Sequence, residues 1–202
     1  MERTVDLYLA SGSPRRRELL AQIGVNFDVV AAEVDESPLP NELPADYVCR
    51  LSKMKAKAGI VTARNLGLPE RPTLGADTTV LLGNQILGKP KNQTDALAML
   101  TRLSGTSHVV LTAVTLIKGE KSTTCLSESK VEFRPLTKTE MLSYWATGEP
   151  ADKAGAYGIQ GMGAVFVKAI HGSYSGVVGL PLAETAELLK LYKVPFWQTR
   201  AV

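Results

Sequence analysis

The segment of residues 11–16, Ser-Gly-Ser-Pro-Arg-Arg, combines residue types that suit it to bind phosphate. Ser13 is a good N-cap, and Pro14 is favoured in the first helical turn, so a helix is expected to begin here. Free backbone N–H groups and the positive end of the helix dipole attract anions, and Arg15 and Arg16 add two permanent charges. An Arg pair at a helix start is often simply solvated. This pair follows the first expected strand of an α/β unit, where ligands collect, and that position favours phosphate binding.

Two carboxylates lie within or just past other expected strands. Asp77 interrupts an apolar segment, where a carboxylate is costly unless it is hydrogen-bonded or binds a cation. Either backbone N–H groups satisfy Asp77, or it is a general base or a ligand of a hard metal ion such as Mg²⁺. Glu36 belongs to an acidic segment, residues 33–36, just past the second expected strand.

Two lysines could neutralise a bound polyphosphate. Lys55 lies in a lysine-rich helical segment, where a solvated surface charge is an equally good explanation. Lys89 is a single cation in a Gly-Lys-Pro turn, which favours a role in binding. Together these groups suggest a mechanism in which cations hold a polyphosphate while carboxylates position a metal ion and an attacking water.

The hydrophobic pattern predicts alternating strands and helices that must position these residues. We expect strands over residues 5–10, 27–32, 73–82, 85–87, 108–117, 123–134 and 164–170. Helices are expected over residues 14–23 and 44–62, after Asn92 or Thr94, after Thr137, and over residues 181–192, with flexible breaks around residues 153–163 and 172–179. In the 44–62 helix we expect an apolar stripe of Tyr47, Val48, Leu51, Met54, Ala58 and Val61. This order predicts an α/β fold with a long, mixed, twisted sheet flanked by helices and a central cleft between two lobes.

Composition limits the remaining possibilities. The 202 residues, 45% of them hydrophobic and 21% charged, suit one globular domain over residues 1–202. A formal charge of +3, spread along the chain, does not suggest a nucleic-acid partner. Cys49 and Cys125 are expected to be buried, reduced thiols, and His108 and His171 to be structural. Because no segment has the length of a membrane span, we expect a cytoplasmic protein with no membrane partner.

Motifs along essentially the whole chain resemble the Maf family of nucleoside triphosphate pyrophosphatases. These motifs are residues 9–16, 34–36, 55–56, 74–78, 89–90, 103–106 and 153–161. The resemblance implies an inosine-triphosphatase-like fold of the Maf/Ham1 type and a homodimer. It also implies hydrolysis of a nucleoside triphosphate to the monophosphate and pyrophosphate with a divalent cation, which would be Mg²⁺, Mn²⁺ or Co²⁺.

The resemblance also implies roles for individual residues. Asp77 would be the proton acceptor and Glu36 its acid/base partner, with both as metal ligands and Lys89 as a third catalytic residue. Ser11, Arg15, Arg16, Lys55 and Lys89 would bind the substrate and its phosphates.

The stretch around Gln160 resembles the branch that acts on dTTP and UTP, and marks Arg15, Thr78 and Gln160 as specificity positions. The Gln160 carboxamide offers a donor and an acceptor that complement uracil or thymine. Departures from the family pattern are Thr79, where an aliphatic residue is expected, and Arg17, which extends the basic pair.

Three other functions remain open from the sequence. One is a non-catalytic nucleotide-binding regulator of cell division, and another is a Maf enzyme that prefers 7-methyl-GTP. The third, a binder of RNA or DNA backbones, fits the modest charge poorly. The leading hypothesis is a pyrophosphatase for dTTP and UTP, which could also remove modified pyrimidine nucleotides.

Overall fold

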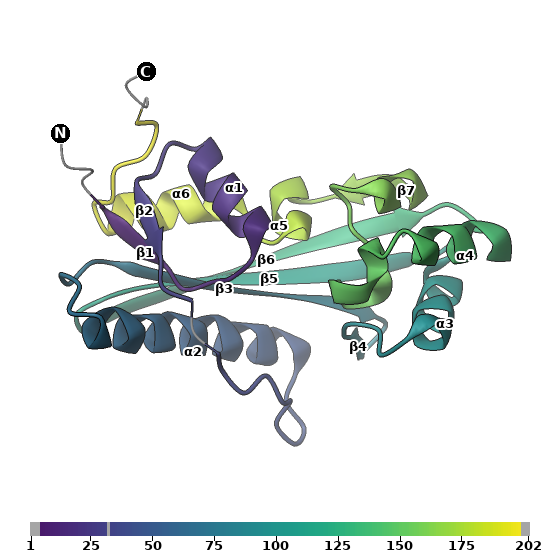
Figure 1. Cartoon of the computed structure of the whole chain (residues 1–202), viewed down its shortest axis with the longest axis horizontal. Helices are drawn as coiled ribbons and strands as arrows, with labels where there is room; N and C mark the ends of the chain where they lie inside the picture. Colours follow the sequence, from purple (N-terminus) through teal and green to yellow (C-terminus); the bar gives the residue numbers. More distant parts are fainter. Residues whose placement is uncertain (1–4, 32, 199–202) are drawn as a thin grey trace. The chain divides into compact units, whose positions relative to one another are not determined.

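The computed structural model describes residues 5–31 and 33–198 (Figure 1). Its first elements are β1 (Leu7–Leu9), α1 (Pro14–Gln22) and β2 (Phe27–Val29). β1 pairs in parallel with β2 and also with β3 (Thr73–Leu82), where Tyr8 lies opposite Thr73. Parallel neighbours need a crossover connection, and α1 supplies it between β1 and β2. The predicted strand–loop–helix unit around residues 11–16 is therefore confirmed.

The remaining elements follow the predicted alternation of strands and helices. They are α2 (Pro44–Asn65), β4 (Gln85–Leu87), α3 (Gln93–Leu103), β5 (Ser107–Lys118), β6 (Lys121–Phe133), α4 (Lys138–Ala146), β7 (Val167–His171), α5 (Tyr174–Val178) and α6 (Leu182–Leu191). The strand order is β2-β1-β3-β5-β6-β7, with β4 antiparallel to β3 and β7 antiparallel to β6. Parallel and antiparallel pairs thus share one sheet, which confirms the mixed α/β class.

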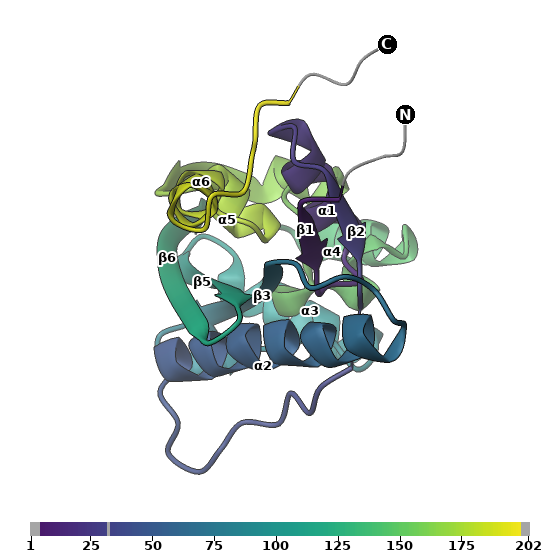
Figure 2. The same cartoon turned by 90° about the vertical axis from the view of Figure 1, so that its left-hand side faces the viewer.

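The chain divides into two compact units. The first contains Met1–Asp77, Thr112–Ser127 and Gly179–Val202, and the second contains Thr78–Leu111 and Glu128–Val178. In the first unit α2 covers one face of the strands, and α1 and α6 cover the other (Figure 2). In the second unit α3 and α4 pack against each other. The chain passes between the units within β3, β5 and β6, and the single-domain interpretation stays a prediction.

The buried face of α2 differs from the predicted apolar stripe. Its buried residues are Val48, Leu51, Ser52, Ala56, Gly59 and Ala63. Tyr47, Met54 and Ala58 are only partly buried, and Val61 is 53% exposed, so the predicted stripe was wrong at Val61. The reason is close packing, since a Cβ on Gly59 would lie 2.5 Å from the Ala10 Cβ. Small residues allow this approach where larger apolar side chains would not.

Two other segments correct the sequence prediction. Residues 164–166 belong to a 3₁₀ helix, Met162–Phe166, and the last strand begins only at Val167. The break expected around residues 172–179 contains the short helix α5. Glycine-rich sequence was taken as flexible there, although one-turn helices need little periodicity to form.

Capping predictions were confirmed at two helices and only partly at a third. The Asn92 side chain accepts a hydrogen bond from Asp95 N, and Thr137 forms a capping box with Glu140. Ser13 occupies the N-cap position of α1, but its side chain makes no capping hydrogen bond.

The two cysteines are not joined by a disulfide, and each of the two histidines lies against a polar side chain. Cys49 and Cys125 are free, as expected, but each is only partly buried, so that part of the prediction was wrong. Burial raises the pKa of both thiols, which leaves them protonated near neutral pH. His108 is buried and its Nε2 lies 2.8 Å from the Tyr157 hydroxyl, whereas His171 Nε2 lies 3.2 Å from Glu132 Oε1.

Candidate active site

The Lys55 ammonium lies between two carboxylates of the first unit. Its Nζ is 2.6 Å from Asp77 Oδ1 and 2.6 Å from Glu36 Oε1. The Lys55 side chain is 14% exposed, so it is not the solvated surface charge that a lysine-rich helix first suggests. One cation therefore brings together three of the residues singled out in the sequence.

Asp77 is a carboxylate in a nearly dry environment, 6% exposed within β3. Burial raises its pKa, and this effect exceeds the opposing effects of Lys55 and Arg16. A carboxylate whose pKa is raised toward neutrality accepts a proton more readily than an ordinary aspartate. The expectation that a buried Asp77 needs a partner is confirmed, and the partner is Lys55, not backbone N–H groups alone.

The loop before α1 is held by its own side chains. Ser11 Oγ accepts hydrogen bonds from Ser13 N at 3.3 Å and from Arg16 Nη1 at 3.1 Å. Arg16 Nε donates to the Gly179 carbonyl at 2.9 Å, which fixes the guanidinium next to the helix start. Partial burial lowers the Arg16 pKa, while the nearby Asp77 raises it. Arg16 is thus within electrostatic reach of Asp77, and Arg15 lies half-buried beside it.

The segment that carries Glu36 is fixed by residues that the sequence analysis did not single out. The Tyr47 hydroxyl donates to the Glu36 carbonyl at 2.9 Å, and Arg50 Nη2 donates to the Ser37 carbonyl at 3.1 Å. Arg50 also forms a two-point ion pair with Glu42, at 2.5 Å and 2.7 Å. The spacing of Tyr47, Arg50 and Lys55 along one helix could have indicated a shared polar face. The sequence analysis instead placed Tyr47 in the apolar stripe.

Three predicted site residues belong to the second unit. Thr78 follows Asp77 in β3, and its side chain points to the opposite face of the strand because successive strand residues alternate. Lys89 is exposed after β4, and Gln160 is exposed in a turn that follows a short 3₁₀ helix, Ala154–Ala156. Their joint action with Asp77 and Lys55 stays a prediction.

The chain is similar to known proteins over nearly its whole length. A family model described as "Maf-like protein" matches residues 6–192. The chain belongs to the Maf family. Among curated Maf relatives, a protein of Hahella chejuensis named dTTP/UTP pyrophosphatase is 53% identical over 191 residues, which cover 95% of this chain and 94% of that protein. A protein of the same name from Pseudoalteromonas translucida is 51% identical over 186 residues, 92% of this chain and 96% of that one.

A solved structure, the Ham1 protein of Staphylococcus aureus, overlaps with a TM-score of 0.42 and 10% identity. It covers 63% of this Maf chain and 71% of its own. So slight a likeness supports no conclusion, and the inosine-triphosphatase-like label stays a prediction.

The carboxylate pair of this Maf chain fits a divalent cation that is shared with a substrate. Glu36 and Asp77 converge on one cation, the Lys55 ammonium, so both can reach a single positive centre. Within the described residues, no group of three or more His, Cys, Asp or Glu could hold a metal ion by itself. Mg²⁺ commonly takes one or two carboxylates and completes its coordination with water and substrate phosphates. The donor set therefore suits such an ion when a triphosphate is bound.

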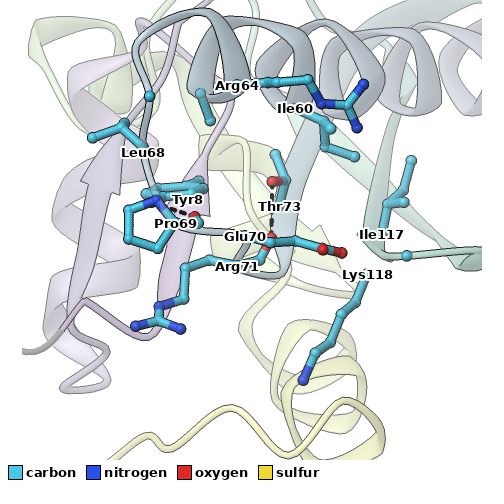
Figure 3. Close-up of a pocket in the computed structure, with 13 residues that line it drawn as sticks. Tyr8, Ile60, Arg64, Leu68, Pro69, Glu70, Arg71, Thr73, Ile117 and Lys118 are labelled. Atoms are coloured by element: carbon cyan, nitrogen blue, oxygen red, sulfur yellow. Dashed lines mark hydrogen bonds between the residues drawn. The ribbon is translucent and has the colours of Figure 1, made fainter.

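A separate hollow of about 350 Å³ lies near the C-terminal end of α2 (Figure 3). None of the predicted site residues lines it. The side chains of Arg64, Arg71 and Lys118 border it but point in different directions, and Arg71 Nε donates to the Val5 carbonyl. This hollow lacks converging groups and is not the candidate active site.

Among the described helices, none is long and apolar enough to cross a membrane.

Proposed function

We propose that this Maf protein hydrolyses dTTP and UTP to the monophosphate and pyrophosphate. The observation that carries the proposal is the buried Asp77 paired, together with Glu36, to the Lys55 ammonium. An arrangement of two carboxylates and a lysine beside an Arg-bearing helix start suits phosphoanhydride hydrolysis. The names of the relatives, which are about half identical over nearly their whole length, support the choice of substrate.

Phosphate oxygens are bound, in this proposal, at the loop of residues 11–16. Ser11, Arg15 and Arg16 lie at the N-terminus of α1, where backbone N–H groups and the helix dipole favour an anion. Lys55 and Lys89 add positive charge that offsets the charge developing on the leaving pyrophosphate. Arg16 is already oriented by Ser11 and Gly179, so little side-chain entropy is lost on binding.

Asp77 acts as the proton acceptor for the attacking water. Its raised pKa brings it closer to the working pH, which favours proton transfer in the transition state. Glu36 and Asp77 together would hold a divalent cation, Mg²⁺, Mn²⁺ or Co²⁺. When bound, this ion would neutralise charge on the phosphate oxygens. Lys55, which lies beside both carboxylates, would bind a phosphate oxygen of the substrate.

Base selection is assigned to Gln160, with Thr78 and Arg15 as further specificity positions. A carboxamide pairs its donor and acceptor with a carbonyl and the N3–H of uracil or thymine. A base whose donor and acceptor do not match the orientation in which the carboxamide is held leaves a group unpaired, which costs binding energy. The family resemblance further supports a cytoplasmic homodimer of single-domain subunits without nucleic-acid or membrane partners. Light scattering after size-exclusion chromatography checks the dimer.

The experiment measures pyrophosphate release from a panel of triphosphates, including 7-methyl-GTP, with each divalent cation. We expect dTTP and UTP to be the fastest substrates, and Asp77→Asn to reduce their turnover by at least about 100-fold, as loss of a general base does. Asp28→Asn, the same change at a half-buried strand residue, serves as the control. Failure of the wild type to hydrolyse any triphosphate overturns the proposal.

A further inference from the structure

Gln160 is presented at the tip of a short turn in the second unit. Ile159 and Gln160 form the turn, which the hydrogen bond from Gly161 N to the Gly158 carbonyl closes at 3.3 Å. Within the part of the chain that is described, the Gln160 carboxamide is exposed and has no hydrogen-bond partner. The backbone of the turn sets where this side chain begins, and therefore which region the carboxamide can reach.

Two side chains from outside the turn hold both of its ends. The Tyr144 hydroxyl of α4 accepts a hydrogen bond from Gly158 N at 2.9 Å and donates one to Glu149 Oε1 at 2.7 Å. Glu149 Oε2 accepts from Met162 N at 2.8 Å, and Oε1 accepts from Gly163 N at 3.1 Å. Three backbone amides, one before Gln160 and two after it, thus bind to one tyrosine–glutamate pair.

The glycines of this segment allow the pair to lie directly against the backbone. A Cβ on Gly161 would overlap the Glu149 carboxylate, and a Cβ on Gly163 would lie 2.6 Å from the Tyr144 hydroxyl oxygen. Burial raises the Glu149 pKa, but the hydrogen bonds from Tyr144, Met162 and Gly163 outweigh it and leave the pKa below its ordinary value. Glu149 is therefore ionised at neutral pH, where its bonds to backbone N–H groups are strengthened by its charge.

We propose that Tyr144 and Glu149 are positioning residues that set the base preference of the enzyme by fixing the turn that carries Gln160. This inference rests on the proposed function, because it takes Gln160 to be the group that reads the base. Recognition by a carboxamide depends on its placement, since a small displacement loses both hydrogen bonds to the base while the phosphate contacts remain. Neither residue needs to touch the substrate.

The test compares Tyr144→Phe with Tyr192→Phe. Tyr192 is also buried, and its hydroxyl lies 3.0 Å from Thr123 Oγ1, but it belongs to the first unit. For Tyr144→Phe we expect KM for dTTP and UTP to rise about 10-fold, as loss of one well-placed hydrogen-bonded contact does, with kcat within about 2-fold of wild type. In Tyr144→Phe, the preference for dTTP and UTP over CTP and GTP should decrease by the same factor. Tyr192→Phe should leave this preference unchanged.

A double-variant cycle separates positioning from general damage. In a Gln160→Ala background, Tyr144→Phe should cause no further loss of base preference, since the group that it positions is gone. An undiminished second loss, or an equal fall of kcat on every nucleotide, would overturn the inference. Glu149→Gln provides a second variant, expected to act in the same direction, should Tyr144→Phe not fold.

A readout without catalysis keeps the two proposals apart. Hydrogen exchange at the amides of Gly158, Met162 and Gly163 should quicken in Tyr144→Phe and in Glu149→Gln, but not in Tyr192→Phe. Unchanged exchange at these amides contradicts the positioning role even in an active enzyme. If the wild type hydrolyses no triphosphate, the proposed function fails, and base preference is then scored on binding of dTTP and GTP by calorimetry, with the same expected narrowing.

Discussion

Gly75 and Ala56 are in such close approach that a Cβ on Gly75 would overlap the Ala56 backbone nitrogen and lie 3.0 Å from its Cα. Gly75 lies two residues before Asp77 on the same face of β3, and Ala56 directly follows Lys55 in α2. The missing side chain allows the helix to approach the strand closely enough for the lysine to reach the aspartate. The ion pair of the candidate site therefore depends on a glycine that has no chemistry of its own.

Gly75→Ala is expected to destabilise the fold and weaken the site together. The added methyl group meets backbone, which cannot rotate away, so α2 must shift at a cost of about 1 to 3 kcal/mol or more. Urea denaturation should give a lower free energy of unfolding, and turnover of dTTP should fall with it. Gly88→Ala is the control, because nothing lies within 4 Å of a Cβ there. Equal stability of the two variants would contradict the close packing.

Lys55→Met should destabilise the protein more than Asp77→Asn does. Removal of the ammonium takes away the ion-pair partner of the buried Asp77 carboxylate beside Glu36 and leaves Arg16 as the remaining nearby positive charge, which costs about 1 to 3 kcal/mol. Removal of the Asp77 charge leaves Lys55 still paired to Glu36. The double variant should therefore lose less stability than the sum of the single variants, with a coupling of about 1 kcal/mol or more. Unfolding free energies of the four proteins at pH 7 measure this, and strict additivity would exclude a direct ion pair.

Mn²⁺ binding, followed by electron paramagnetic resonance in the absence of nucleotide, should depend on the carboxylate pair. Glu36→Gln and Asp77→Asn each remove a charged oxygen ligand and should weaken binding by about 10-fold or more. Lys55→Met should bind Mn²⁺ at least as tightly as the wild type, because the ammonium competes for the same two carboxylates. Asp28→Asn should leave binding unchanged. Weaker binding in Lys55→Met would show that the lysine helps to hold the ion.

The order of the elements could be predicted from the sequence because it depends on local patterns. The apolar run before residues 11–16, the proline at position 14 and the caps at Asn92 and Thr137 each set an element boundary through neighbouring residues. Asp77 could be singled out in the same way, since a charge in an apolar segment is visible without a structure.

The rest depended on packing between segments far apart in the chain. From the sequence alone, a solvated surface position and a place in the site were equally good explanations for Lys55. No pattern in a lysine-rich helix indicates how closely the helix packs. Tyr47 has the apolar spacing of a core residue, yet its hydroxyl holds the Glu36 segment. Residues 164–166 were predicted as strand although they end a 3₁₀ helix, because the five residues of that helix are too few to show a period.

His108 should make the stability of the protein fall as the pH is lowered from about 6.5 to about 4. Its ring is buried against Phe133 and Tyr157, and burial lowers its pKa to about 4. The buried Nδ1 has no hydrogen-bond partner among the described residues, so a proton added there would have no acceptor. In the unfolded chain the same side chain titrates near its ordinary value of about 6.5, so between these two pH values only the unfolded state binds the proton. The contribution of the neutral His108 to the free energy of unfolding is therefore fully present above about pH 6.5, and about 3 kcal/mol of it is lost as the pH falls to about 4.

His108→Gln does not titrate in this pH range and should lack this loss. Denaturation of the two proteins at pH 7, 5.5 and 4 measures the difference. Parallel curves for both would mean that the histidine is protonated in the fold and that its surroundings are polar.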